Sequence, residues 1–217
     1  MSSHSHKRVK LSLADLELLY FDIPGKGEPI RLFFRYIGLQ FKDTRLTRQE
    51  FEALREQGKL LFNQLPCLRS GDHYLVQSGA ILRYLSRLAG HFPEDLTSAA
   101  LVDAVMDQVN DLYAGISVAR YRERFGFEAV DDTALAEATK ALNERIIPRH
   151  LGFFERLLKN SSSGWIANTE EPSVADFALV PRVQELPGSA PGISLDILQP
   201  FPRLLGLIGR FNALFVE

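Results

Sequence analysis

The stretch from Phe62 to Tyr84, FNQLPCLRSGDHYLVQSGAILRY, is typical of a strand pair followed by a helix. Leu65 precedes Pro66, and a residue before proline is driven out of the helical region into an extended conformation. Ser70-Gly71-Asp72 is a turn between two short strands. The helix begins at Gln77-Ser78, where free backbone N–H groups and the positive end of the dipole favour an anion. The stretch therefore predicts an extended edge next to an anion site, such as one for a carboxylate.

The sequence before this stretch alternates strands and helices. The apolar run 16–21 ends before a Pro24-Gly25 turn, which predicts a buried strand. A helix with Pro29 in its first turn follows and stops at Gly38. Residues 39–46 form the next predicted strand, and Thr47-x-x-Glu50 is a capping box for a helix over 49–57. This order predicts an α/β domain, which we place at residues 12–91.

After His91 the strand signals become few and helical spacing dominates. The predicted helices cover 99–125, 133–158 with a bend at Pro148, a segment that starts at the box-like cap Ser173-Val174-Ala175-Asp176, and 202–215. The second domain is therefore predicted to be all-helical, over residues 96–217.

Composition excludes several classes of protein. The 217 residues are 46% hydrophobic and 24% charged, with a net charge of −2, which fits a globular protein and argues against nucleic acid as a partner. No segment approaches the ~18 continuous apolar residues of a membrane span, and the N-terminus lacks the apolar core of a signal peptide. The single cysteine, Cys67, excludes an intramolecular disulfide and a cysteine-based zinc site. With the histidines dispersed, we expect no metal site, no membrane and a cytoplasmic location.

Two features have both a structural and a functional interpretation. Asp103, Asp107 and Asp111 share one helix face, which is either solvated or meets a cation from a ligand or a partner chain. Tyr20 ends the first strand, so its phenol is either part of the core or lies at the sheet edge where α/β ligands bind. Cys67, on a strand directly after Pro66, is favoured as a core residue over a nucleophile.

Five motifs occur together in a recognisable order. They are Tyr20-Phe21, the run from Gly25 to Arg31 (GKGEPIR), Asn63-Gln64-Leu65-Pro66, the segment from Gln77 to Leu85 (QSGAILRYL) and Ser173-Val174-Ala175-Asp176. With them the chain resembles the cytosolic glutathione S-transferases, and among these the tyrosine-type sigma class. The resemblance runs from about Leu16 to the last helix. It implies a thioredoxin-like N-terminal domain, an all-α C-terminal domain and a homodimer.

The resemblance also implies a binding site for glutathione, the co-substrate. Pro66 would be cis, and the backbone of Leu65 would pair with the cysteinyl part of glutathione while Gln64 bonds nearby. Gln77 and Ser78 would take the γ-glutamyl carboxylate, and Asp111 would reach its ammonium across the dimer. Either Arg55 or Lys59 would bind the glycyl carboxylate, and the sequence does not distinguish between them.

Tyr20 would be the catalytic residue. A phenol that donates a hydrogen bond to the glutathione sulfur stabilises the thiolate and lowers the thiol pKa. The electrophile would lie in an apolar pocket whose expected walls are Phe21, Ile23, Ala114, Val118 and Tyr121.

Two positions depart from the family pattern. Lys26 stands where many tyrosine-type members have an arginine, and Phe51 stands where a tryptophan usually contacts the glycyl end. Both positions belong to the expected glutathione site. The departures bear on affinity and efficiency more than on the fold.

The favoured function is transfer of glutathione to small hydrophobic electrophiles, for detoxification. One alternative is a glutathione-dependent isomerase of the prostaglandin D synthase type, which Asp107 and Asp111 suggest and Asn110 argues against. The other is a binding or structural relative without activity, which the joint presence of Tyr20, Gln64 and Gln77 argues against.

Overall fold

The computed structural model describes residues 15–189 and 192–216. Its first part is a four-stranded sheet in the order β2-β1-β3-β4. The strands are β1 (Leu16–Phe21), β2 (Lys42–Leu46), β3 (Cys67–Ser70) and β4 (His73–Val76). β1 pairs in parallel with β2 and antiparallel with β3, which pairs antiparallel with β4. The carboxyl ends of β1 and β2 therefore meet at one edge of the sheet, where Tyr20 lies.

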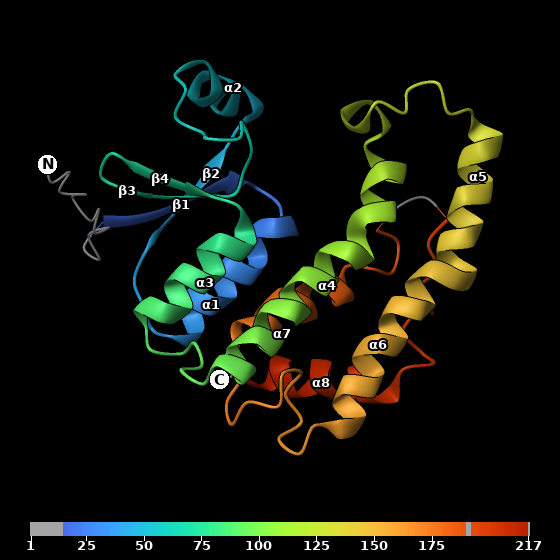
Figure 1. The fold of residues 1–217 in the computed structure, drawn as a ribbon. Coiled ribbons are helices and arrows are strands. Elements are labelled where there is room, and N and C mark those ends of the chain that lie inside the picture. The colour runs from blue at the N-terminus through green and yellow to red at the C-terminus, as the bar shows by residue number, and fades with distance from the viewer. Residues whose placement is uncertain (1–14, 190–191, 217) are drawn as a thin grey trace, which may run out of the picture.

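Helices cover both faces of this sheet (Figure 1). Leu16 and Leu18 of β1 pack into one core with α1 (Glu28–Tyr36) and α3 (Ser78–Leu88). Leu19 points the other way and packs with Phe51 of α2 (Arg48–Glu56). This alternation is the period-2 pattern of a strand buried on both faces. The thioredoxin-like class predicted for this domain is confirmed.

The second part of the chain is helical, as predicted. It contains α4 (Leu96–Arg120), the short turn η3 (Arg122–Phe125), α5 (Asp132–Ala141), the wide turn η4 (Leu142–Ile146), α6 (Ile147–Asn160), α7 (Val174–Gln184) and α8 (Pro202–Ala213). In Figure 1, α4 and α6 run side by side and α7 lies behind α4, next to α1 and α3. No helix in the described ranges is long and apolar enough to cross a bilayer.

Some predicted boundaries differ from the structure. β2 begins at Lys42, later than the predicted residue 39. α4 ends at Arg120 because the backbone of Tyr121 leaves the helical region, with φ −128° and ψ 51°. The predicted bend near Pro148 is the π-helical turn 142–146, which relieves the clash of a proline ring with the carbonyl four residues earlier. The domain bounds 12–91 and 96–217 extend to residues outside the described ranges and stay a prediction.

A chain of aromatic rings joins the two domains. The ring of Phe33 in α1 lies 5.0 Å from that of Phe177 in α7, nearly edge to face. Phe177 in turn lies 4.9 Å from Phe211 of α8. All three side chains are almost completely buried. The apolar core therefore continues from the sheet into the helical domain and holds α7 against α1.

The capping box predicted at Ser173 fixes where α7 begins. Its Oγ accepts from the N–H of Ala175, and its own N–H donates to the carboxylate of Asp176 at 2.9 Å. The other carboxylate oxygen of Asp176 accepts from the N–H of Ile166 at 2.9 Å. This buried carboxylate therefore ties the preceding loop to the first turn of α7.

Replacement of Asp176 tests how much this tie stabilises the fold. In Asp176→Ala, two buried N–H groups and one hydroxyl lose their acceptor, so we expect the free energy of unfolding to fall by about 3 kcal/mol. Urea denaturation followed by circular dichroism measures the change. Asp95→Ala, which removes the exposed cap of α4, is the control and should cost about 1 kcal/mol. Equal losses in the two variants would contradict the special role of Asp176.

Candidate active site

Tyr20 lies at the carboxyl end of β1, beneath the turn that leads into α1. Its side chain is 8% exposed. The backbone N–H of Lys26 donates to its hydroxyl oxygen over 3.1 Å. With this oxygen already accepting one bond, the phenolic proton is left to donate to another group. The geometry is that of a hydrogen-bond donor held in place by the backbone.

The glycines on either side of Lys26 allow this turn to approach Tyr20. A Cβ at Gly25 would lie 2.7 Å from the Tyr20 oxygen, and a Cβ at Gly27 would lie 2.5 Å from the ring carbon Cδ1. Neither distance leaves room for a side chain. The sequence did not predict this contact, because the residues next to a glycine in the chain do not show which side chain lies against it in the fold.

Arg31 supports the same turn from below. Its guanidinium is bound by the carboxylate of Asp43, with Nε to Oδ2 at 3.0 Å, and donates to the carbonyl of Ile23 at 3.1 Å. It also lies 5.7 Å from the centre of the Tyr20 ring. Because Arg31 is buried, these bonds hold the turn strongly.

The electrostatic setting keeps the Tyr20 phenol protonated. Burial raises its pKa above the ordinary value, and the hydrogen bond from Lys26 opposes this only in part. Among charged neighbours, Arg182 lowers the pKa while Glu185 raises it. At neutral pH the group is therefore a neutral donor, able to stabilise an anion such as a thiolate by a hydrogen bond.

The predicted binding stretch has the expected backbone geometry. The Leu65-Pro66 bond is cis. Gln77 has φ 75°, a region that a residue other than glycine seldom occupies, and such conformations cluster at functional sites. No side chain caps the N-terminus of α3, and the same holds for α1, α6 and α8. The other helices, α2, α4, α5 and α7, are capped by Thr47, Asp95, Asp131 and Ser173. The start of α3 therefore has free N–H groups, which is the feature on which the predicted anion site depends.

The remaining predicted glutathione residues lie in different surroundings. Gln64 is half-buried beside Leu65, next to the cis bond. Phe51 is buried, with its ring 5.4 Å from Phe21. Arg55 and Lys59 are exposed; Arg55 pairs with Glu52, and the Lys59 ammonium lies 5.6 Å from the Tyr74 ring centre.

The acidic face of α4 meets a cation of its own chain at two of its three carboxylates. Arg83 of α3 pairs with Asp103 and, at 3.1 Å, with Asp107. Of the two interpretations of this face, a solvated surface or a cation from a ligand or partner chain, neither describes these two residues, because their cation comes from the same chain. Asp111 is exposed and forms no ion pair with another described residue.

Opposite Tyr20 the structure brings residues that the sequence did not predict. Arg182, near the end of α7, has its guanidinium 3.7 Å from the centre of the Tyr113 ring of α4 and pairs with Glu185. Loss of water around the Lys26 ammonium lowers its pKa, and the positive charges of Arg182 and of Arg124 in η3 lower it further.

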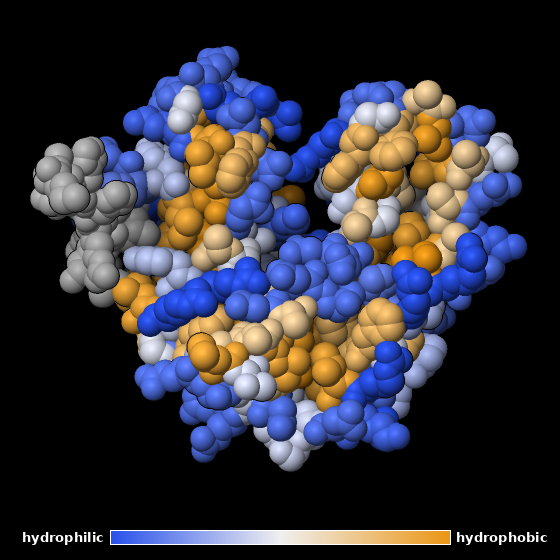
Figure 2. Space-filling model, viewed as in Figure 1, coloured by the Kyte–Doolittle hydropathy of each residue, from blue (hydrophilic) through white to orange (hydrophobic). Residues whose placement is uncertain are grey.

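A cleft separates the two domains at this point. Figure 2 shows a hollow between the α/β domain and the C-terminal end of α4, with hydrophilic residues on much of its visible rim. Of the expected pocket walls, Ile23 and Tyr121 are about half-exposed, Phe21 and Val118 are half-buried, and Ala114 is exposed. The Tyr121 hydroxyl is close enough to raise the pKa of Tyr20, which places the end of α4 on the same side of the cleft as Tyr20.

Cys67 takes no part in this site. Its side chain is completely buried, and burial raises the pKa of the thiol to about 12. It is therefore inert at neutral pH, as expected for a core residue. Among the described residues, no group of three or more His, Cys, Asp or Glu side chains is arranged to hold a metal ion.

Comparison with known proteins identifies the family. The model of the glutathione S-transferase N-terminal domain matches residues 16–87, and that of the C-terminal domain matches residues 124–214. A curated relative, glutathione S-transferase 1 of Ascaris suum, is 37% identical over 69% of this chain and 70% of its own length. The chain belongs to the glutathione S-transferase family. It is therefore an enzyme, with glutathione as its co-substrate.

Other relatives agree with this family. Glutathione S-transferase P of Caenorhabditis elegans is 38% identical over 76% of this chain and 73% of its own. The solved structure of the Onchocerca volvulus Pi-class glutathione S-transferase superposes with a TM-score of 0.74, at 30% identity, over 92% of this chain and 88% of that one. Prostaglandin synthase D of Nilaparvata lugens has a TM-score of 0.77 over 93% of this chain and 94% of its own, but only 24% identity, so it supports the fold alone.

The contact between Gly27 and Tyr20 provides a test of the site. In Gly27→Ala, the added methyl group would lie 2.5 Å from the Tyr20 ring and 3.1 Å from Nη1 of Arg31, so the ring has to move. We expect glutathione conjugation to slow by about tenfold or more, as small displacements of catalytic groups do. Gly206→Ala in α8 is the control, because its Cβ meets no atom within 4 Å and activity should be unchanged. Full activity in Gly27→Ala would show that the close approach does not position Tyr20.

Proposed function

We propose that this protein is a tyrosine-type glutathione transferase that activates the thiol of glutathione for attack on small hydrophobic electrophiles. The main support for this proposal is the Tyr20 phenol, which is buried and protonated. The N–H of Lys26 holds its oxygen in place, so the hydroxyl can donate a hydrogen bond to another group. Donation to sulfur favours the thiolate over the thiol, whose free pKa is about 8.5. A charge-assisted bond of about 1.5–3 kcal/mol corresponds to one to two pKa units.

The chemical step follows from this arrangement. The thiol proton leaves to solvent, and the thiolate sulfur forms a bond to the electrophilic carbon. With an aryl halide, the carbon–halogen bond breaks and halide departs with the electron pair. The phenol of Tyr20 keeps its proton throughout and acts by hydrogen bonding.

We assign glutathione binding to the residues just before the cis bond and to the start of α3. The backbone of Leu65 beside Gln64 takes the cysteinyl part, and the uncapped N-terminus at Gln77 and Ser78 takes the γ-glutamyl carboxylate. Exposed Arg55 or Lys59 takes the glycyl carboxylate, while the buried position of Phe51 favours a packing role beneath it. Lys26 contributes its backbone N–H to Tyr20.

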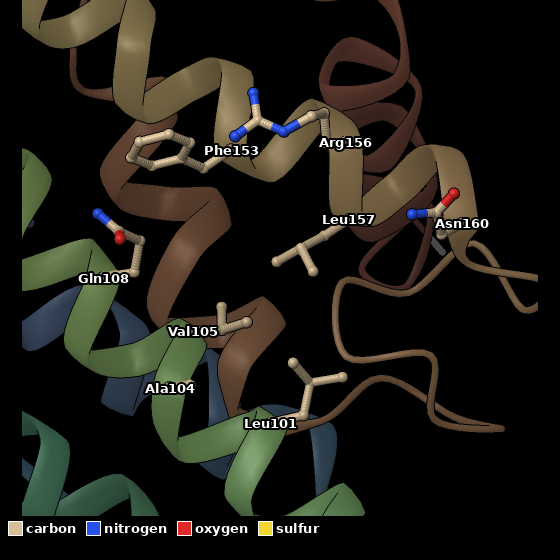
Figure 3. Close-up of a pocket in the computed structure, with 8 residues that line it drawn as sticks. All are labelled: Leu101, Ala104, Val105, Gln108, Phe153, Arg156, Leu157 and Asn160. Atoms are coloured by element: carbon tan, nitrogen blue, oxygen red, sulfur yellow. The ribbon is translucent and has the colours of Figure 1, made fainter.

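The proposal includes a homodimer in which each copy covers the other's groove. The loop before β3 exposes two large apolar side chains, Leu61 at 73% and Phe62 at 54%. Between α4 and α6 lies a groove of about 460 Å³. Figure 3 shows that its lining residues are Leu101, Ala104, Val105, Gln108, Phe153, Arg156, Leu157 and Asn160. In the proposed dimer, Phe62 of each copy enters the groove of the other. Two-fold symmetry then forms this contact twice and buries both apolar surfaces.

Asp111 fits this dimer. It follows Gln108, a groove residue, by three positions on α4 and so lies on nearly the same face. A carboxylate there, exposed and without an ion pair among the described residues, is positioned to reach the γ-glutamyl ammonium in the partner's site. The sigma class stays a prediction, since the structural relatives include a Pi-class transferase. Detoxification and the cytoplasmic location also stay predictions.

The role of Tyr20 is tested by removing only its hydroxyl. In Tyr20→Phe, conjugation of glutathione to 1-chloro-2,4-dinitrobenzene should slow by about tenfold or more while glutathione affinity changes little. Steady-state kinetics across pH and calorimetry measure the two. Tyr84→Phe is the control, since the Tyr84 hydroxyl forms no hydrogen bond within the described part of the chain. Equal rates for Tyr20→Phe and wild type would remove Tyr20 from catalysis, and no rate in the wild type would favour the isomerase or the inactive relative.

The cross-subunit contact is tested with Asp111 and Phe62. Asp111→Ala should weaken glutathione binding by about tenfold, as loss of a charge-assisted bond does. Phe62→Glu places a charge in the proposed contact and should give a monomer by sedimentation, with a similar loss of affinity. If the Phe62→Glu monomer binds glutathione as tightly as the dimer, the contact across the interface is wrong.

A further inference from the structure

The wall of the cleft opposite Tyr20 carries more positive charge than activation of a thiol needs. Arg182 and Arg124 come from the helical domain and Lys26 from the turn beside Tyr20, and the charges of both arginines act on the Lys26 ammonium. Glu185 is the acidic side chain that acts on Tyr20, and it pairs with Arg182. Among the charged groups that act on Tyr20 and Lys26, positive ones therefore predominate on the side where the electrophile is expected to bind.

Arg182 is held rigidly. Its guanidinium lies 3.7 Å from the centre of the Tyr113 ring, and the Tyr113 hydroxyl donates to the carbonyl of Arg182. The side chain is 14% exposed, so its charge acts in a poorly hydrated setting where an anion gains more than it would in water. Tyr113 thereby fixes both the backbone and the side chain of this arginine.

Arg182 also has donors to spare. Among the described residues its one hydrogen bond to a protein acceptor runs from Nη1 to Glu185, so Nε and Nη2 stay available. A guanidinium edge with two N–H donors matches the two oxygens of a carboxylate. Arg124 is exposed and has no ion pair with any described residue. The second guanidinium therefore adds charge without an acid of its own.

We propose that Arg182, assisted by Arg124, is a specificity-determining residue that binds the carboxylate of an anionic electrophile. This inference rests on the proposed transferase function and names the substrate class of the same site. Its reacting carbon would face the sulfur held at Tyr20, while its carboxylate would lie on the α7 side of the cleft. Tyr121, half-exposed at the end of α4, would cover the apolar part between them.

Two aryl halides that differ by one carboxylate form the test: neutral 1-chloro-2,4-dinitrobenzene and anionic 4-chloro-3,5-dinitrobenzoate. For each, kcat/KM is divided by the uncatalysed rate constant with glutathione. We expect the wild type to favour the benzoate by about tenfold, and the preference to shrink at high salt, because a guanidinium–carboxylate contact is partly screened there. Equal acceleration of both substrates would overturn the proposal.

Variants separate this role from others. Arg182→Met keeps most of the packing on Tyr113 but removes the charge. Arg124 forms no ion pair with another described residue, so we expect Arg124→Gln to fold as the wild type does. Each should lower the preference for the benzoate by about threefold to tenfold, with less change for the neutral substrate. Lys159→Gln, at the far end of α6, removes one positive charge outside the cleft and is the control. An equal loss for both substrates in both arginine variants would assign the arginines to the thiolate and overturn the proposal.

A binding measurement keeps this outcome distinct from failure of the proposed function. Calorimetry compares the affinity of the wild type for the glutathione conjugates of the two aryl halides, which requires no turnover. Tighter binding of the carboxylated conjugate, lost in Arg182→Met, would support the anion subsite even in an enzyme that conjugates neither halide. Equal affinity for the two conjugates would overturn the subsite whatever the activity.

Discussion

The packing of Phe33 against Phe177 is the contact on which the rest of the structure depends. It joins α1, which covers the sheet, to α7, which runs through the helical domain, and Phe211 completes it from α8. The two walls of the cleft belong to different domains, so their spacing is only as constant as this junction. Because the rings are buried and meet edge to face, the domains cannot slide without opening a cavity.

The same junction gives Arg182 its position. α7 begins at the Ser173 capping box, which Asp176 ties to the preceding loop, and Phe177 then anchors its first turn to α1. Arg182 follows nine residues after Ser173, which is about 13 Å along a helix axis. The cap at Ser173 and the buried ring of Phe177 therefore fix the start of α7, and the regular rise of the helix then sets the position of Arg182.

The parts of the fold that the sequence predicted are those with local causes. Thr47 and Glu50 form their capping box within one helical turn, as do Ser173 and Asp176, so four neighbouring residues contain the whole interaction. The end of α4 at Arg120 and the partner of Asp103 had no such local cause. Arg83 reaches Asp103 from another helix, and only the packing of α3 beside α4 shows that the acidic face has a cation of its own chain.

The candidate site divides in the same way. Gln77 could be proposed from local features, because a helix start favours an anion. Tyr20, at a strand end, stayed open between a core and a ligand-binding role until the resemblance to the family was considered. The need for glycine on either side of Lys26 could not be predicted. It follows from the close approach of the backbone to Tyr20, which leaves no space for a Cβ atom and is visible only in the folded structure. Arg182 had no signal, since a single arginine in an apolar helix gives no hint of the cleft it faces.

The departure at Lys26 can now be weighed in physical terms. The bond that orients Tyr20 comes from the backbone N–H of residue 26, and an exchange of arginine for lysine leaves that group unchanged. What the exchange removes is a planar fork of donors on the cleft side, and Arg182 presents such a fork from the opposite wall. In the proposed reaction, the neutral phenol and the arginines would act on different charges, the phenol on sulfur and the arginines on the electrophile. A thiolate stabilised by one neutral donor keeps more of its nucleophilicity than one that forms a close ion pair. The reason is that stronger stabilisation of the thiolate lowers the thiol pKa further, and nucleophilicity falls with that pKa.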